Sequence, residues 1–189
     1  MVLFMRLSVL ALDVLVYMPA VAWFVLQRLE NRSTRVRHMA LWTVWCQPAL
    51  ILVDHGHFQY NAVMLGLAAL SFALLLTKQP NVHTAADAPA ELQRLLLDTL
   101  SRHVSLQYVA AAVFFSMSLC FKQMALYYAP TVFVIMLGRC VGLARTNVAR
   151  CAALFAGLAC TTTAVFALLW LPWLGQMDEL GQVLHRILD

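Results

Sequence analysis

The sequence predicts an all-α protein, a polytopic membrane helical bundle with about six transmembrane helices. Of its 189 residues, 62% are hydrophobic and only 12% are charged, and the mean hydropathy is +0.77. Soluble domains contain about 25% charged residues. Apolar runs of 15 to 24 residues recur along the chain, separated by short polar segments, and about 20 helical residues cross the hydrocarbon core of a bilayer. We therefore expect residues 1–189 to form a single transmembrane domain in a lipid bilayer.

The first three spans are expected at residues 7–27, 39–53 and 62–77. Asp13 lies inside the first and is expected to face other helices, because a carboxylate is costly against lipid. The second is short, and Pro48 is expected to interrupt its backbone hydrogen bonding. The third offers a face of small residues for close helix packing. These are Gly66, Ala68, Ala69, Ser71 and Ala73.

The only extended hydrophilic segment covers residues 78–103. Its first part contains turn-forming residues, and the leucines between 90 and 103 recur at helical spacing, which predicts a cytosolic loop with a surface amphipathic helix. Three further spans follow at residues 104–121, 124–143 and 151–174. Lys122 and Gln123 separate the first two of them, and a lysine at this position must lie at the membrane interface or find a partner.

The basic residues are distributed unequally when these spans alternate across the membrane. Ten of the 13 Lys and Arg residues fall on one side, which the positive-inside rule makes cytosolic. The basic excess is therefore better explained by membrane orientation than by nucleic-acid binding. Residues 54–61, Lys122 and Gln123, and the tail from Gln176 are placed on the opposite, lumenal face. The ten cytosolic residues are Arg28, Arg32, Arg35, Arg37, Lys78, Arg94, Arg102, Arg139, Arg145 and Arg150.

A polar stretch of eight residues lies between two apolar runs, at residues 54–61. It reads Asp54-His55-Gly56-His57-Phe58-Gln59-Tyr60-Asn61, and together with the two flanking runs it predicts a membrane hairpin with this stretch at its tip. Polar side chains at the end of a membrane helix usually face a cavity or a polar ligand. Two interpretations stay open from the residues alone: these side chains recognise a ligand with hydroxyl or phosphate groups, or they merely cap two helices at the interface.

Metal and disulfide chemistry receive little support. His55 and His57 beside Asp54 could ligate a metal, but a zinc site needs at least three protein ligands, and the sequence indicates no third one nearby. We therefore expect no metal site. The five cysteines are odd in number, show no C-x-x-C spacing and lie in or at the ends of apolar runs, so they are expected to pack rather than to pair.

The stretch from Asp54 to Asn61 resembles the signature of the dolichyl-phosphate-glucose-dependent α-1,3-glucosyltransferases of the endoplasmic reticulum. Further matching segments occur in the order that the family shows. They are Phe4-Met5-Arg6, Leu41-Trp42, Gln47-Pro48, Leu65-Gly66 and Lys122-Gln123-Met124-Ala125-Leu126-Tyr127-Tyr128-Ala129-Pro130. Between the two enzymes of this family, Gly56 and Lys122-Gln123-Met124 resemble the one that adds the first glucose to the nine-mannose lipid-linked oligosaccharide.

The resemblance implies a partial GT-C glycosyltransferase fold in the membrane of the endoplasmic reticulum, with the active face lumenal. It implies dolichyl phosphate glucose as donor, a dolichol-pyrophosphate-linked oligosaccharide as acceptor, an inverting transfer with a carboxylate as general base, and no cofactor. The alternatives are the related enzyme that adds the second glucose, a noncatalytic membrane fragment, and a transporter-like module, which should show more polar positions along several spans than Asp13 alone.

The catalytic base is not assigned by the resemblance. The resemblance implies that the family's catalytic aspartate lies in a loop upstream of the segment that matches Phe4-Met5-Arg6. The chain is therefore expected to be an internal fragment without that aspartate, and it is expected to be inactive alone. Asp54 is expected to orient His55 or His57 or to cap a helix. The candidates for contacting substrate or shaping its pocket are Asp54, His55, His57, Gln59, Tyr60, Asn61, Lys122 and Gln123, with Lys122 balancing a phosphate charge.

Overall fold

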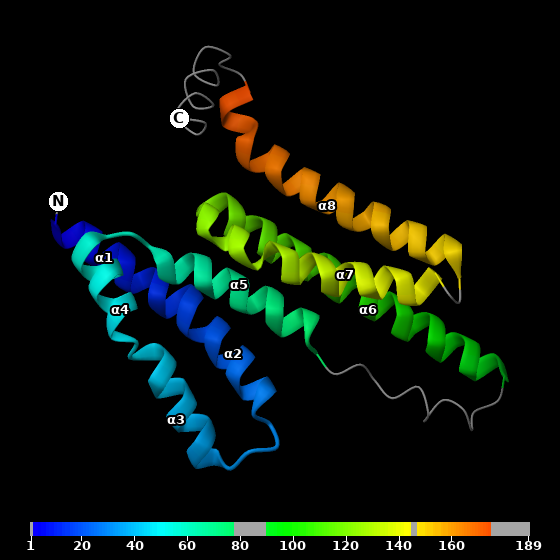
Figure 1. Cartoon of the computed structure of the whole chain (residues 1–189), viewed down its shortest axis with the longest axis horizontal. Coiled ribbons are helices and arrows are strands. Elements are labelled where there is room, and N and C mark those ends of the chain that lie inside the picture. The colour runs from blue at the N-terminus through cyan, green and yellow to red at the C-terminus, as the bar shows by residue number, and fades with distance from the viewer. Residues whose placement is uncertain (1, 78–89, 145–146, 175–189) are drawn as a thin grey trace.

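The structure is a computed structural model that describes residues 2–77, 90–144 and 147–174. Across these ranges the regular elements are helices, and no strand occurs among them, which confirms the all-α class. The polar loop predicted at 78–89 and the tail from Gln176 lie outside the described residues. The helices run roughly lengthwise through the molecule, with α5 (Asn61–Leu75) and α6 (Ala90–Phe121) near its middle and α8 (Val148–Leu174) on one side (Figure 1).

The first apolar run forms one continuous helical rod with an irregular centre. It consists of α1 (Val2–Leu12), the π-helical segment η1 (Asp13–Tyr17) and α2 (Met18–Arg28). Pro19 is the second residue of α2, and because the rod is continuous, its missing N–H removes one backbone hydrogen bond to the preceding turn. A π-helical turn contains an extra residue, and such turns are frequent at functional sites. The expected span is therefore helical, and its irregular turn begins at the half-buried polar position Asp13.

The second apolar run is broken where Pro48 was expected to break it. The helix α3 (Thr34–Trp45) ends two residues before Gln47, and Pro48 starts the short helix α4 (Pro48–Ile51) at a position where proline is well tolerated. The π-helical segment η2 (Leu52–Gly56) follows directly. The tip of the hairpin is thus shorter than the eight residues predicted, because the first three of them, Asp54, His55 and Gly56, belong to η2. The two arms also splay apart, with α2 lying between α3 and α5 (Figure 1).

The small-residue face of the third run packs as predicted. Gly66, Ala68 and Ser71 are buried, and the backbone of Tyr17 approaches Gly66 so closely that a Cβ there would lie 3.0 Å from the Tyr17 Cα. Small residues allow membrane helices to approach at the backbone, and hydroxyl groups can hydrogen-bond between them.

The helices α5 and α6 are linked by two such bonds. Ser71 donates to the Ala111 carbonyl and Ser118 donates to the Met64 carbonyl, each over 2.9 Å, and both serines are buried. These bonds fix the register of α5 against α6 at two heights, because each one satisfies a hydroxyl group that has no access to water.

The helix α6 continues without interruption through the boundary expected at residue 104. It therefore joins the helix predicted at 90–103 to the following span, and the amphipathic character of that part, like its cytosolic location, stays a prediction. The chain breaks at Lys122, whose backbone is extended, and resumes as the 3-10 helix η4 (Gln123–Tyr128) and as α7 (Ala129–Ala144). The separation of two spans at Lys122 and Gln123 is thus confirmed.

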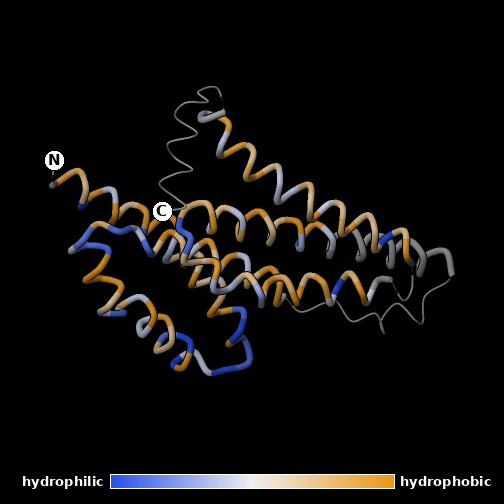
Figure 2. The backbone as a smooth tube through the Cα atoms, turned by 45° about the horizontal axis from the view of Figure 1, so that its top comes forward, coloured by the Kyte–Doolittle hydropathy of each residue, from blue (hydrophilic) through white to orange (hydrophobic). Residues whose placement is uncertain are grey.

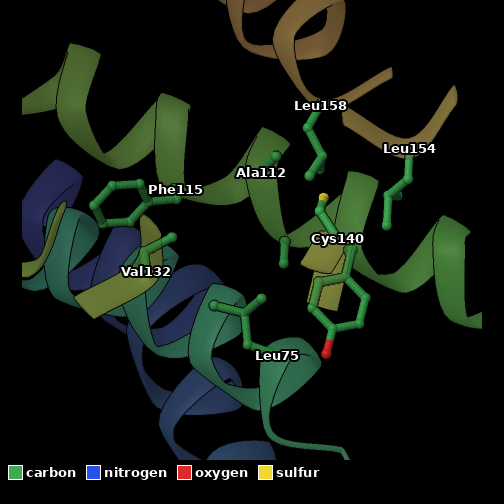
Figure 3. Close-up of a cluster of buried hydrophobic side chains, with 9 residues drawn as sticks. Leu75, Ala112, Phe115, Val132, Cys140, Leu154 and Leu158 are labelled. Atoms are coloured by element: carbon green, nitrogen blue, oxygen red, sulfur yellow. The ribbon is translucent and has the colours of Figure 1, made fainter. Parts of the chain in front are cut away.

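The main core forms where α5, α6, α7 and α8 meet. Figure 3 shows its side chains converging from these four helices. The buried members are Leu75, Tyr108, Ala111, Ala112, Phe115, Val132, Cys140, Leu154 and Leu158. A second, smaller cluster joins the rod to α5 through Tyr17, Val21 and Ala62. The two clusters hold α5 between the rod and α6.

Three helical stretches in the described part of the chain are long and apolar enough to cross a bilayer. They are Leu3–Arg28, Gln123–Gly142 and Val148–Pro172, and two shorter apolar helices cover Asn61–Leu75 and Ser105–Phe121. Hydrophobic residues cover most of these helices, and the most hydrophilic stretches gather at helix ends and turns (Figure 2). An all-α membrane bundle is therefore the architecture that this chain adopts.

Candidate functional site

Within the segment from Asp54 to Asn61, residues 57–60 form a tight connection between η2 and α5. Its turn contains Phe58 and Tyr60, two non-glycine residues with a φ of 54°. A left-handed backbone conformation costs an L-residue about 1–2 kcal/mol, so it persists only where surrounding contacts hold it. Such strained residues cluster at functional sites. The turn is consequently a segment whose shape depends on its neighbours.

Asp54 caps the helix that follows it. The carboxylate is 1% exposed, and its Oδ2 accepts from the backbone N–H of Ala62 over 2.6 Å while its Oδ1 accepts from the Asn61 side-chain amide over 2.8 Å. An anion at a helix N-terminus satisfies free N–H groups and interacts favourably with the helix dipole. Of the roles expected for Asp54, the structure therefore supports the helix cap.

Lys122 reaches the same turn from the break between α6 and η4. Its ammonium group donates to the Asn61 Oδ1 and, over 3.4 Å, to the Gln59 Oε1. Both acceptors are neutral amide oxygens, which orient the ammonium group without cancelling its charge. Asn61 thus bonds Asp54 through its amide nitrogen and Lys122 through its amide oxygen. The result is a half-buried cation that is held in place and able to attract an anion.

His55 and Tyr60 contact the first helical rod rather than each other. The Nε2 of His55 lies 2.8 Å from the Oδ2 of Asp13, and the side chains are 33% and 15% exposed. The hydroxyl of Tyr60 lies 2.9 Å from the Oγ of Ser8. The expectation that Asp54 orients a histidine is therefore wrong for His55, because Asp13 does so from another helix. The expectation that Asp13 faces other helices rather than lipid is confirmed.

A cavity of about 350 Å³ opens beside this cluster. It lies where the start of α4, the start of α5 and η4 meet, and Asn61 places a polar group in its wall. Most of the remaining wall is apolar. The lining residues are Gln47, Ala49, Leu50, Asn61, Met64, Leu65, Met124, Tyr127 and Tyr128. Lys122 is not part of this wall, but it donates to Asn61, which is. An apolar space beside a residue that holds a cation suits an amphiphile with an anionic head group.

Five of the eight candidate residues take part in two separate groups of side-chain contacts. Asp54, Asn61, Gln59 and Lys122 form one, and His55 belongs to the other with Asp13. Tyr60 contacts Ser8 instead. His57 and Gln123 are exposed and take no part in the hydrogen bonds of this cluster. These two positions are placed near the turn and at the start of η4 by the backbone alone.

Some residues of the site were not singled out from the sequence. Ser8 is one, and a polar side chain within an apolar run was the available signal. The wall residues Leu50 and Met64 carried no such signal, because their side chains are ordinary for a membrane helix. No group of three or more His, Cys, Asp or Glu side chains suited to a metal ion occurs within residues 2–77, 90–144 and 147–174.

Comparison with known proteins adds independent observations. Residues 1–188 match the family described as "ALG6, ALG8 glycosyltransferase family". A relative from Saccharomyces cerevisiae, named dolichyl pyrophosphate Man9GlcNAc2 alpha-1,3-glucosyltransferase, is 36% identical over 97% of this chain and 29% of its own length. A relative from Schizosaccharomyces pombe with the same name preceded by "probable" is 37% identical over 98% of this chain and 31% of its own.

A mammalian relative from Rattus norvegicus also carries the name dolichyl pyrophosphate Man9GlcNAc2 alpha-1,3-glucosyltransferase. It is 35% identical over 98% of this chain and 30% of its own length. The chain thus spans about three tenths of the length of these curated relatives. Since the family match extends over nearly every residue, the resemblance seen in the sequence motifs is confirmed: the chain belongs to the ALG6, ALG8 glycosyltransferase family.

Proposed function

We propose that the chain contributes to an enzyme that transfers glucose from dolichyl phosphate glucose to the dolichol-linked nine-mannose oligosaccharide, forming the first α-1,3 glucose linkage. The names of the relatives from Saccharomyces cerevisiae and Rattus norvegicus support this acceptor and linkage. Gly56 and the run Lys122-Gln123-Met124 support the first transfer over the second. The donor is proposed from the family resemblance, and the chemistry of the site is compatible with a lipid phosphate.

The observation that carries the proposal is the position of Lys122 near a mostly apolar cavity. Its ammonium group is held by two neutral amide oxygens, and one of these belongs to Asn61, which also lines the cavity. A lipid phosphate sugar combines an apolar chain with an anionic phosphate and a hydroxyl-rich glucose. The cation would bind the phosphate, and the tyrosine and amide groups of the wall would meet hydroxyl groups.

The proposed reaction makes one bond and breaks one. The acceptor hydroxyl oxygen attacks the anomeric carbon of glucose, the bond between that carbon and the phosphate oxygen breaks, and a carboxylate takes the hydroxyl proton. Lys122 would stabilise the negative charge that collects on the departing dolichyl phosphate. Asp54 is unsuited to be the base, because it is buried and both its oxygens already accept hydrogen bonds. The base is assigned to no residue of this chain.

A chimaera tests the proposed function. In this yeast chimaera, residues 1–189 replace the matching stretch of the Saccharomyces cerevisiae relative. Microsomes that contain it and lack the yeast protein are expected to glucosylate the nine-mannose acceptor when dolichyl phosphate glucose is supplied. A chimaera that reaches normal abundance yet forms no glucosylated lipid would contradict the proposal. Transfer only to an acceptor that already has one glucose would instead assign the second step.

We also propose that the site faces the lumen of the endoplasmic reticulum. The bias of basic residues supports this orientation. In sealed microsomes, a cysteine introduced at the exposed Ser33 is expected to react with an impermeant thiol reagent from the cytosolic side, and one at the exposed Gln59 only after permeabilisation. Reaction of both cysteines from the same side would contradict the orientation.

A further inference from the structure

The first helical rod holds the turn of the site through two polar contacts. Ser8 meets the Tyr60 hydroxyl over 2.9 Å, and Asp13 meets His55 over 2.8 Å. Asp13 is the only acidic residue of the apolar span Leu3–Arg28, and a carboxylate at such a position is costly unless it is paired. The contact with His55 supplies that pairing. It also joins two segments that are 42 residues apart in the chain.

Both members of this pair lie on π-helical turns. Asp13 begins η1, and His55 is the fourth residue of η2. An inserted residue in a helical turn rotates the side chains beyond it relative to those before it. Two irregular turns facing each other through a single polar contact therefore set how η2 and the turn after it are oriented against the rod.

The contact continues by covalent and hydrogen bonds toward the cation. His55 is adjacent in sequence to Asp54, whose carboxylate binds the side chain of Asn61. Asn61 in turn accepts from Lys122. Asp13 lies outside the wall of the cavity beside Asn61. Its influence on a bound molecule would therefore be exerted through the turn and not by contact.

We propose that Asp13 and His55 are positioning residues: their contact holds the strained turn at Phe58–Tyr60 against the first helical rod and so keeps Asn61 and Gln59 at the ammonium group of Lys122. The consequence for glucose transfer rests on the function proposed above. The consequence for the geometry of the turn does not, because the contacts that carry it are independent of any substrate.

Exchange of the two partners is the decisive variant. In the yeast chimaera, Asp13→Ala is expected to reduce kcat for glucose transfer about tenfold, since small displacements of a binding group have effects of this order or more. The double variant Asp13→His and His55→Asp restores a contact of the same chemistry and is expected to recover transfer to within about threefold. Failure of the exchange to improve on either single variant, at equal protein abundance, would overturn the proposal.

Gln27 provides a matched control on the same rod. Its side-chain amide donates to the Thr77 hydroxyl over 2.9 Å and so links the other end of the rod to the end of α5. Gln27→Ala removes one polar contact between the rod and the segment that follows α5, far from Lys122. It is expected to leave kcat unchanged. An equal loss of kcat in Gln27→Ala and Asp13→Ala would mean that the rod contributes only general stability, which would also overturn the positioning role.

Thiol labelling measures the same effect without catalysis. In the 189-residue chain with Gln59→Cys, the ratio of reaction rates with an anionic and a cationic thiol reagent reports the local potential, after subtraction of the labelling of the native cysteines. Lys122 is expected to favour the anionic reagent about tenfold. Adding Asp13→Ala is expected to lower this ratio by about fivefold, because the turn moves away from the ammonium group.

The sign of this change separates displacement from a direct charge effect. Loss of the negative Asp13 alone would make the potential at residue 59 more positive and would raise the ratio. An unchanged or increased ratio would therefore overturn the positioning role. If the yeast chimaera transfers no glucose, the proposed function fails while the labelling ratio still decides this inference. If the chimaera transfers glucose and the ratio does not fall, the inference alone fails.

Discussion

Replacing Lys122 with methionine is expected to lower glucose transfer by the yeast chimaera about 100-fold, the effect typical of removing one donor that stabilises a developing negative charge. Methionine keeps most of the length of the side chain and removes its charge. The neutral partners Asn61 and Gln59 cannot supply a replacement cation. The measurement is kcat/KM for dolichyl phosphate glucose in microsomes, with the abundance of the chimaera determined on the same samples.

Two variants accompany this experiment. Lys122→Arg keeps the positive charge in a different shape and is expected to retain transfer to within about tenfold of the unaltered chimaera, since arginine also binds phosphate. Arg6→Met removes an exposed cation of α1 that the proposed topology places on the same side of the membrane as Lys122, and it is expected to have no effect. Normal transfer by Lys122→Met, or equal losses from Lys122→Met and Arg6→Met, would contradict the phosphate-binding role.

Replacing Gly66 with valine is expected to destabilise the fold by about 3 kcal/mol, at the upper end of the cost of overpacking a core. A Cβ on residue 66 would meet the Tyr17 Cα at 3.0 Å, with the Tyr17 nitrogen at 3.3 Å. These are backbone atoms and cannot swing away as a side-chain end can. The helix α5 would have to move off η1. A titration with a denaturing detergent in mixed micelles measures the free energy of unfolding.

Gly138 is the matched control for Gly66. It lies in α7, and a Cβ there would meet nothing within 4 Å. Gly138→Val is therefore expected to change the free energy of unfolding by less than about 0.5 kcal/mol, as is usual for substitutions away from close contacts. Similar losses in the free energy of unfolding in both variants would show that the helices of this protein are sensitive to valine at any glycine position. The close approach of Gly66 to Tyr17 would then not be the cause.

The sequence alone determined the class of the protein and identified the polar segment at residues 54–61. Hydropathy predicted the membrane helices, because the bilayer admits few other structures. Proline at 48 and the polar pair at Lys122 and Gln123 predicted two breaks that occur. The small residues of the third run predicted its close packing, since only side chains of this size allow backbones to approach. These features depend on local chemistry, which a sequence shows directly.

Only the tertiary structure decided which of those residues meet. That Asp54 caps α5 while Asp13 holds His55 depends on the rotation of two helices, and two π-helical turns change that rotation without a pattern that hydropathy could reveal. That Lys122 meets Asn61 depends on the register of α5 against α6, which two buried serine bonds set. The cavity beside Asn61 forms only where three chain segments meet. The sequence could not predict it, because the apolar side chains of its wall are individually ordinary for membrane helices.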